Sequence, residues 1–459
     1  MNTIAQPQRD IPIIADVDVC VIGGGPGGLP AAIAAARQGA STMLVEMQGF
    51  LGGMATSGQV GPILAITASR SSEPTVAGLL VELCDRLAAI GQGKPYEECL
   101  KARCAPFGVE GLKIIADRMV HEASVRTLLH AFFVDSVVED GRMTHAIVES
   151  KSGRQAVRAK VFVDGTGDAD VACRAGAECT LGRPADNLPM SMGSEFILGG
   201  TEALTPEVRQ ALVDKTRAAA EAGEVNVYGL GLGGHGSTMD PGHASINCTR
   251  FGGNCADVED LTQAEFTTRE ITWKLLDLWR SVPGAEGLHL VATPTHVGIR
   301  ESRQLVGLHR ITGQDVVEGR KYEDSVARCS YWIDIHCPRG LGVPAGVHLC
   351  WTKCTKTDCY MLTDYADQLP DELYPPEGDW FDIPYRTLVP QTVDGLLVSG
   401  RCISADYQAM GAMRVIGPCM AIGEAAGIAA AMAAKAEVQP RDVDVQTLRR
   451  SLASVGALV

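Results

Sequence analysis

The stretch VCVIGGGPGGLPAAIAAARQGASTMLVE, residues 19–46, decides the fold prediction. An apolar, β-branched run of strand length, 17–22, leads into it, and five of the six residues in 23–28 are glycine. Residues 29–39 have the composition of a helix, and 41–46 form a second apolar strand that ends in an acid. This order predicts the strand–turn–helix–strand unit that opens a parallel sheet.

The spacing of the glycines and the acid indicates a nucleotide site. Gly23 permits the tight turn, Gly25 lets the backbone approach a pyrophosphate, and Gly28 lets the helix pack against the strand. The helix N-terminus offers amide donors and partial positive charge to phosphates. Glu46 ends the second strand, where a carboxylate can accept hydrogen bonds from ribose hydroxyls. The unit therefore predicts dinucleotide binding.

Further glycine-containing turns follow strands or begin helices along the chain. They are GFLGGMATSG (49–58), the strand 161–164 that runs into Thr166-Gly167-Asp168, the strand in VDGLLVSGRCIS (393–404) that runs into Gly400-Arg401, and the helix pattern of 414–435 with Gly417 and Pro418 at its start. A domain that binds only NAD would conflict with this C-terminal block.

With these motifs the chain resembles the FAD-dependent oxidoreductases of the glutathione-reductase and fumarate-reductase type, and more narrowly the bacterial group called "FAD-dependent oxidoreductase". The stretches that carry the resemblance are the glycine-rich start, LGGMAT (51–56), VDGTGDAD (163–170), GIRESRQLVG (298–307), YWIDIH (331–336), and three blocks between 384 and 427. They run from one end of the chain to the other but cover only about a third of it. The resemblance implies FAD and names no substrate.

The resemblance also assigns cofactor positions. It implies that Gly23, Gly25, Gly28 and Glu46 contact the AMP half of FAD, and that Gly53 and Thr56 lie along the pyrophosphate and flavin. Thr166, Gly167 and Asp168 match the second FAD motif. Gly400 and Arg401 match the strand end at the ribityl chain, and the helix start at Gly417–Gly423 matches the one at the flavin pyrimidine. The broader superfamily often carries an acid at the position of Arg401, so this chain departs from the pattern there.

The expected fold class is α/β, a Rossmann-like FAD-binding domain of the glutathione-reductase type with an inserted α+β substrate domain. The expected parts are FAD-binding segments 1–70, 111–175 and 383–459, a cap segment 71–110, and a substrate or cap domain 176–382.

Local patterns predict the secondary structure outside the motifs. Residues 57–110 are expected to be irregular, and those from about 121 to 160 to form short strands with turns at Asp140-Gly141 and Ser152-Gly153. Two helices are expected in 205–223 and 264–282, the second burying Trp273, Leu276, Leu278 and Trp279.

The candidate catalytic residues are His336, Arg414, Arg300 and Tyr385. A strand over 331–336 would place Asp334 and His336 on one face, where the carboxylate can orient the imidazole and raise its pKa, which suits a proton mover. Arg414 directly precedes the flavin-facing helix, and Arg300 could clamp a carboxylate or a phosphate. The alternative for these residues is structural: an ion-pair network at a domain boundary and a core histidine.

Charge and cysteine content limit the partners. The net charge of −15 disfavours nucleic acid and membrane surfaces as partners, and the N-terminal residues lack the pattern of a secretory signal. The 15 cysteines match no common metal or iron–sulfur spacing, so free thiols in the cytoplasm are expected. A metal at Cys350, Cys354 and Cys359 is the minor alternative; otherwise no metal is expected.

We therefore expect an FAD-dependent dehydrogenase or reductase that transfers hydride between flavin N5 and a small organic substrate, with an electron acceptor or donor as its second partner. A flavoprotein electron-transfer subunit that serves a partner protein is the first alternative, and a flavin monooxygenase is the second. A homo-oligomer is compatible with the sequence.

Overall fold

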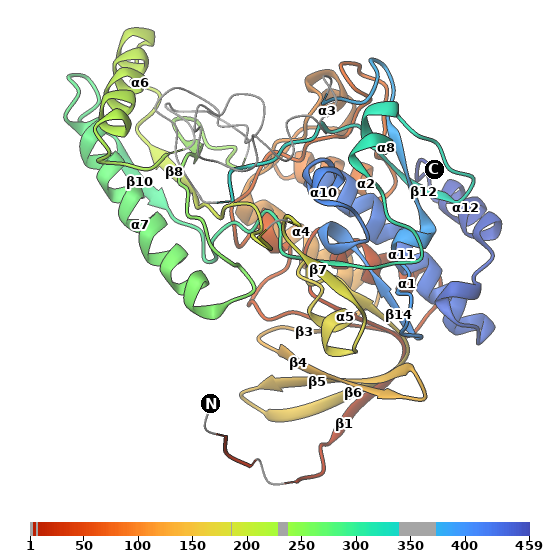
Figure 1. The fold of residues 1–459 in the computed structure, drawn as a ribbon. Coiled ribbons are helices and arrows are strands. Elements are labelled where there is room, and N and C mark those ends of the chain that lie inside the picture. Colours follow the sequence, from red (N-terminus) through yellow and green to blue (C-terminus); the bar gives the residue numbers. More distant parts are fainter. Residues whose placement is uncertain (1–2, 6–7, 185, 228–236, 339–372) are drawn as a thin grey trace.

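The computed structural model describes residues 3–5, 8–184, 186–227, 237–338 and 373–459. The glycine-rich stretch GLGLGG (229–234), the adjacent His235, and the cysteines at 350, 354 and 359 lie outside these ranges. Figure 1 shows two units side by side: a large α/β unit that contains both described ends of the chain, and a smaller unit built around α6, α7, β8 and β10.

The large unit is organised around a seven-stranded sheet. Its order is β3-β2-β1-β6-β5-β4, with β14 pairing the last three residues of β6. Strands β3, β2, β1, β6 and β14 are parallel, and β4, β5 and β6 form an antiparallel meander. The strands are β1 (Ile13–Ile22), β2 (Thr42–Val45), β3 (Arg126–Leu128), β4 (Phe132–Glu139), β5 (Arg142–Ser150), β6 (Gly153–Asp164) and β14 (Leu396–Val398). The predicted α/β fold with a Rossmann-like parallel sheet is confirmed.

Two helices, α1 (Gly28–Arg37) and α11 (Ile416–Ala436), pack on the sheet and on each other. Among the helices that the structure describes, α11 is the one long and apolar enough to cross a membrane, but 89% of its apolar window is buried inside the protein, as in a core helix. Close approach of the pair requires glycine, because a Cβ on Gly423 would lie 2.1 Å from the carbonyl oxygen of Gly27.

The remaining helices of the large unit are short. They are α2 (Leu79–Ala89), α3 (Tyr96–Ala102), α4 (Val109–Glu122), α5 (Asp170–Arg174), α8 (Gly313–Glu318), α10 (Tyr407–Met413), α12 (Val445–Ser454), and the 3-10 turns η1 (Gly53–Ala55), η3 (Tyr385–Thr387), η4 (Gly400–Cys402) and η5 (Pro440–Asp442). The expectation that 57–110 is irregular is wrong, since α2 and α3 lie there. The apolar positions 79, 80, 83, 84 and 87 carry the helical period that identifies α2.

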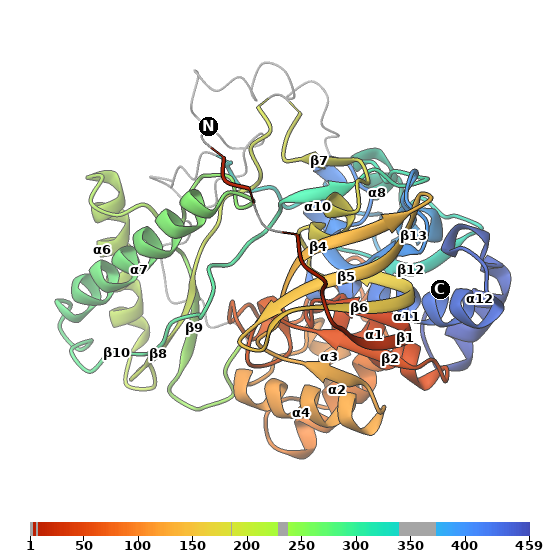
Figure 2. The same ribbon diagram turned by 90° about the horizontal axis from the view of Figure 1, so that it is seen from below.

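The smaller unit has a three-stranded antiparallel sheet in the order β10-β8-β9, with α6 and α7 packed together beside it (Figure 2). Its elements are β8 (Glu195–Gly199), α6 (Pro206–Glu221), β9 (Ala244–Asn247), α7 (Val258–Arg280) and β10 (His289–Ala292). Both helices were expected. On α7, Leu276 and Trp279 are buried and Leu278 is half-buried, but Trp273 is 49% exposed because it faces away from α6.

Two further short ladders belong to the large unit, β7 (Cys179–Leu181) with β11 (Arg303–Leu305), and β12 (Ser325–Cys329) with β13 (Phe381–Pro384). The apolar side chains of 305–337 belong to the core of the large unit, whereas the separate core of the smaller unit is formed by residues between 196 and 290. The domain boundaries stay predictions, but this packing divides the expected segment 176–382 between two cores.

Candidate active site

A cavity of about 500 Å³ lies where the parallel strands end. The glycine-rich loop after β1, the ends of β2, β6 and β14, and the first turn of α11 line one part of it. Residues from the smaller unit and from the loops 296–300 and 331–336 line the other part. Ligands of open parallel sheets bind at the carboxyl ends of the strands, so this is the expected place for the cofactor.

The glycine-rich loop is shaped by close backbone contacts. Gly23 has a φ of +94° and lines the cavity together with Gly25. Gly28 does not line it: a Cβ there would lie 1.8 Å from the carbonyl oxygen of Gly23, so this glycine lets the helix pack against the turn. A Cβ on Gly53, from the next loop, would lie 2.6 Å from the Cα of Gly25. Side chains are therefore excluded from this part of the wall.

Glu46 lies at the end of β2 and lines the cavity. Its carboxylate accepts hydrogen bonds of 2.7 Å from the backbone amides of both Gly24 and Gln48. Burial raises the pKa of Glu46, and these backbone bonds oppose the rise. The acid is thus positioned against the glycine loop before any ligand arrives.

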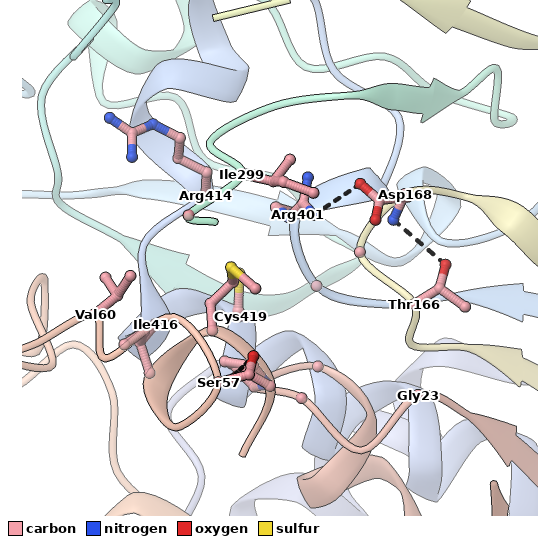
Figure 3. A pocket seen from close by; sticks show the side chains of 18 of the residues that line it. Gly23, Ser57, Val60, Thr166, Asp168, Ile299, Arg401, Arg414, Ile416 and Cys419 are labelled. Atoms are coloured by element: carbon pink, nitrogen blue, oxygen red, sulfur yellow. Dashed lines mark hydrogen bonds and ion pairs between the residues drawn. The ribbon is translucent and has the colours of Figure 1, made fainter. Parts of the chain in front are cut away.

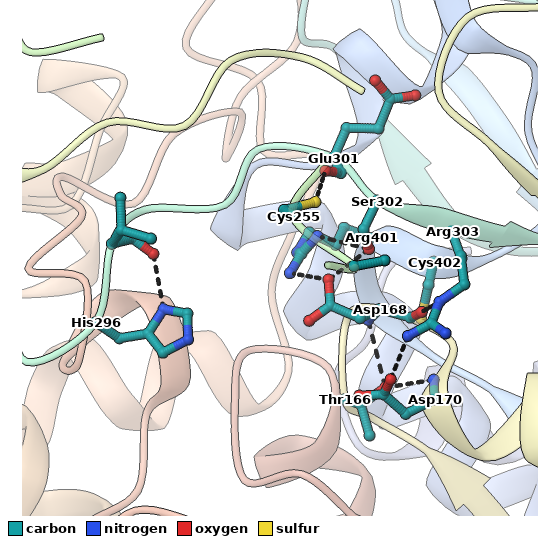
Figure 4. A network of polar contacts seen from close by, with 12 residues as sticks. Thr166, Asp168, Asp170, Cys255, His296, Glu301, Ser302, Arg303, Arg401 and Cys402 are labelled. Carbon is teal, nitrogen blue, oxygen red and sulfur yellow. Dashed lines mark hydrogen bonds and ion pairs between the residues drawn. The ribbon is translucent and has the colours of Figure 1, made fainter. Parts of the chain in front are cut away.

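The second motif forms a polar network with the late strand (Figure 4). Asp164 accepts bonds from both the amide and the hydroxyl of Thr166, at 3.0 and 2.6 Å, which shapes the turn after β6. Asp168 pairs with Arg401 at 2.7 Å and accepts a bond from Ser302. Five motif residues line the cavity here: Thr166, Gly167, Asp168, Gly400 and Arg401. Figure 3 shows Thr166, Asp168 and Arg401.

Three other predicted cofactor residues do not line the cavity. Thr56 is buried and donates to the carbonyl oxygen of Leu51. Gly417 packs under the loop at Leu64, and Gly423 packs against Gly27. The adjacent residues Ser57, Ile416 and Cys419 line the wall instead (Figure 3). Their identities carried no signal in the sequence, because a small or apolar residue suits any packed wall.

The far part of the cavity gathers charged side chains from distant segments. Arg300 donates to the carbonyl oxygen of Ser191 at 2.9 Å and to Asn247 at 3.2 Å. Arg414 donates to Asp334 at 2.8 Å, and the same carboxylate lies 3.3 Å from Nε2 of His336. Four of these line the cavity: Arg300, Asp334, His336 and Arg414. We call this group, with Glu195 and Arg250, the polar end.

His336 is a neutral imidazole. Nη2 of Arg250 lies 3.2 Å from its Nδ1, and a guanidinium can only donate, so Nδ1 must be an acceptor. The ring proton is therefore on Nε2, toward Asp334. Burial lowers the pKa of His336 far below its ordinary value; Asp334 opposes this shift, and Arg250 and Arg300 add to it.

This corrects two expectations about His336. The contact between Asp334 and His336 was expected and is present, but 331–336 is not a strand. The expected rise in the pKa of His336 is wrong, because burial outweighs the carboxylate. Burial also works against ionisation of Asp334, but the Nε2–H of His336 and the guanidinium of Arg414 hold the pKa of Asp334 below its ordinary value.

Tyr385 lies outside the cavity lining. It is buried, its hydroxyl donates to the carbonyl oxygen of Pro440 at 2.7 Å, and burial raises its pKa. Its position is that of a core residue.

The sequence reasoning missed Glu195, which lines the polar end and is 5% exposed. It begins β8, and an acid before an apolar strand has no distinguishing pattern. Only the packing of β8 against the large unit reveals it.

The lining fits an extended dinucleotide. The α1 helix begins without a side-chain cap, so no side chain competes for its first amides. Glycine excludes side chains from the neighbouring wall, and an acid stands at the end of β2. These are the features that bind a pyrophosphate and a ribose.

Comparisons with known proteins agree with this fit. A family model described as "FAD dependent oxidoreductase" matches residues 18–452. The tRNA uridine 5-carboxymethylaminomethyl modification enzyme MnmG of Granulibacter bethesdensis is 32% identical over 174 residues, 36% of this chain and 24% of that protein. Dihydrolipoyl dehydrogenase of Trypanosoma brucei brucei is 54% identical over 46 residues, 10% of each chain. The chain thus matches a quarter or less of the length of these relatives.

Solved structures are similar to this chain only at low scores. The flavin-dependent brominase Bmp2 has a TM-score of 0.42 at 12% identity, covering 96% of this chain and 83% of that one. A geranylgeranyl bacteriochlorophyll reductase-like protein from Thermoplasma acidophilum has a TM-score of 0.41 at 12% identity, covering 96% and 83%. No reaction follows from scores this low.

Proposed function

Because the chain belongs to the family of FAD-dependent oxidoreductases, we propose that it is a dehydrogenase or reductase that acts on a small organic anion. The enzyme class and the cofactor follow from the family. The dehydrogenase or reductase reaction and the substrate class are the proposal, and the polar end of the cavity supports the substrate class.

The residues that would hold FAD follow from their positions. Gly23, Gly25 and the first turn of α1 would take the pyrophosphate, and Glu46 the ribose. The other wall would be formed by Gly53, Thr166, Gly167, Asp168, Gly400 and Arg401. Bound FAD supplies two-electron redox chemistry, and the protein has to place a substrate beside it and handle one proton.

The charge of the polar end is the observation that carries the proposal. Arg250, Arg300 and Arg414 are cations, and Asp334 is the anion among them. His336 is neutral, and burial raises the pKa of Glu195 to about 8, which leaves its carboxyl protonated at neutral pH. These described residues therefore hold two positive charges in excess.

A lining in which cations outnumber anions favours an anionic ligand. Arg300 lines the cavity, and its guanidinium, which donates to Ser191 and Asn247, has further N–H groups that can donate to a carboxylate. A small carboxylic acid would both balance the charge and fit beside a cofactor. An electron-transfer subunit would not need such a cluster inside the cofactor cavity.

The net charge of −15 argues against a tRNA substrate of the kind named for MnmG, because it repels nucleic-acid phosphates. The proposed partners are therefore a small molecule and an electron donor or acceptor. The proposed location is the cytoplasm.

The test uses the purified holoprotein without oxygen. Small carboxylic acids and their matching amides are mixed with it, and flavin absorbance is followed by stopped flow in both oxidation states. We expect an acid, and not its amide, to change the flavin spectrum. Arg300→Gln should weaken saturation by that acid about 100-fold, in line with the loss of a charge-assisted bidentate contact.

Arg303→Gln is the matched control, because Arg303 pairs with Asp170 and lies outside the cavity lining. It should keep the affinity for the acid. Reaction with a partner protein alone would favour electron transfer, and substrate hydroxylation coupled to oxygen uptake would favour a monooxygenase. Either result would contradict the proposal.

A further inference from the structure

Glu195 has the position of a reacting group. It is the first residue of β8, is 5% exposed, and lines the polar end of the cavity. Gly61 lines the same cavity, and its backbone amide opposes the rise in the pKa of Glu195. The carboxyl thus faces the space where a substrate would lie.

A chain of buried hydroxyls leads to Glu195. Ser237 donates to the hydroxyl of Ser245 at 2.8 Å, and Ser245 donates to Oε2 of Glu195 at 3.4 Å. Ser237 is fully buried, and Ser245 nearly so. Each hydroxyl donates to the next group, so the line Ser237–Ser245 directs a hydrogen bond at one oxygen of the Glu195 carboxyl.

The surroundings of Glu195 give it a proton near neutral pH. Burial raises its pKa to about 8, and Arg300, from the loop before β11, opposes the rise most strongly. Arg250, which follows β9, adds to that opposition, as do Gly61 and Ser245. A pKa close to the working pH suits a group that both gives and takes a proton.

His336 is unsuited to this task. Its Nδ1 accepts from Arg250 and its Nε2 faces Asp334, so neither nitrogen is directed to a substrate. Among the described residues that line the polar end, Glu195 is the protonated acid.

We propose that Glu195 exchanges the reaction's proton with the substrate and that Ser245, held by Ser237, positions its carboxyl. This inference rests on the proposed function. In the direction of reduction, the substrate would gain two electrons and one hydrogen from bound FAD, and the proton of the Glu195 carboxyl would form the second new bond to hydrogen. The carboxylate that remains accepts the hydrogen bond of Ser245 and takes up a proton from water when the product leaves. Oxidation reverses each transfer.

The first test measures the flavin half-reaction of the holoprotein against pH. Glu195→Gln should slow it by about 10²–10⁴, the usual contribution of a positioned acid or base. For the wild type, reduction of the substrate should slow above about pH 8, because the carboxyl loses its proton there. Substrate oxidation should instead quicken through the same pH. Glu195→Gln should lose this change of rate near pH 8, which we call the kinetic limb. Glu195→Asp should restore part of the rate and of the kinetic limb.

Ser245→Ala tests the hydroxyl chain. The hydroxyl of Ser245 stabilises the carboxylate of Glu195, so its removal should raise the pKa and move the limb to higher pH. An unmoved limb would remove Ser245 from the proposal.

The second test does not depend on turnover. The infrared carbonyl band of a protonated carboxyl, recorded in D2O, should disappear in the wild type near pH 8. Glu195→Gln should lack that band. Glu301→Gln is the matched control: Glu301 is also buried with a pKa raised to about 8, but it accepts from Met190 and Gln304 outside the cavity lining. This control should lose its own band and keep the kinetic limb.

The outcomes separate this inference from the proposed function. If an acid substrate reacts with Glu195→Gln at the wild-type rate and with the same limb, the proton-transfer role is overturned while the function stands. If no small acid reacts with the wild type, the proposed function fails and the proton transfer fails with it, even where the infrared titration is present.

Discussion

Arg401 and Asp168 form an ion pair of 2.7 Å at the cavity wall, although 233 positions separate them in the chain. The broader superfamily often carries an acid at the position of Arg401. In this chain the arginine at that position is paired with Asp168, from the motif that follows β6. Ser302 donates to the same carboxylate, so the pair ties three segments together.

Breaking this pair should destabilise the protein. Arg401→Met or Asp168→Asn leaves one charge with little exposure and no partner, which costs about 3 kcal/mol of unfolding free energy. The double variant should cost less than the sum of the two, because both charges are removed. Chemical denaturation of all four proteins measures the coupling. The neighbouring pair Arg303–Asp170 is more exposed, so the same cycle there should give under about 1 kcal/mol. Equal coupling in the two cycles would contradict this assignment.

Glu46→Gln should weaken FAD binding by roughly 10–100-fold. The amide keeps the shape of the side chain but loses charge-assisted acceptance from the ribose, worth about 1.5–3 kcal/mol. It also puts an NH2 group against one of the backbone amides of Gly24 and Gln48. Titration of the apoprotein with FAD, followed by flavin fluorescence, gives the dissociation constant. An unchanged constant would mean that the ribose is held elsewhere.

The neutral, buried His336 should make the protein acid-sensitive. The ordinary pKa of 6.5 applies to the unfolded chain, and the pKa in the folded protein is far lower. Below about pH 6.5 the unfolded chain therefore binds a proton that the folded protein does not, and acid favours unfolding by about 1.4 kcal/mol per pH unit. Above pH 6.5 both states are neutral and the effect is absent.

His336→Asn should therefore lose about 2 kcal/mol less stability than the wild type between pH 7.5 and 5.0. Denaturant melts at several pH values measure this, and His336→Gln should behave in the same way. Identical slopes in wild type and variants would show that the imidazole is protonated in the folded protein.

Gly423→Ala should disturb both stability and cofactor binding. The new methyl group would lie 2.1 Å from the carbonyl oxygen of Gly27, so α11 has to move away from α1. Overpacking of this kind costs about 1–3 kcal/mol, and Gly27 lines the cavity, so FAD affinity should fall as well. Gly287→Ala is the matched control, because no atom lies within 4 Å of its Cβ position. Thermal melts and FAD titration of both variants make the comparison.

The sequence by itself determined the cofactor end of this protein. The apolar run 17–22, the glycines that follow and the acid at 46 are consecutive in the chain, and they become β1, the turn before α1, and the end of β2. Local rules suffice there, since a tight turn and a close helix contact admit only glycine. The turns at Asp140-Gly141 and Ser152-Gly153 were predictable for the same reason, and they separate β4, β5 and β6 as expected.

Only the tertiary structure decided the polar end. Glu195, Arg250, Arg300 and His336 come from four separate segments, and the sequence did not show that these segments meet. The alternation in IDIH indicated a contact between Asp334 and His336 but gave the wrong direction for the pKa of the histidine. Whether an imidazole or a carboxyl holds a proton near neutral pH depends on how far it is removed from water and which charges face it. Both are set by segments that meet only when β8, β9 and the late loops pack around the same cavity.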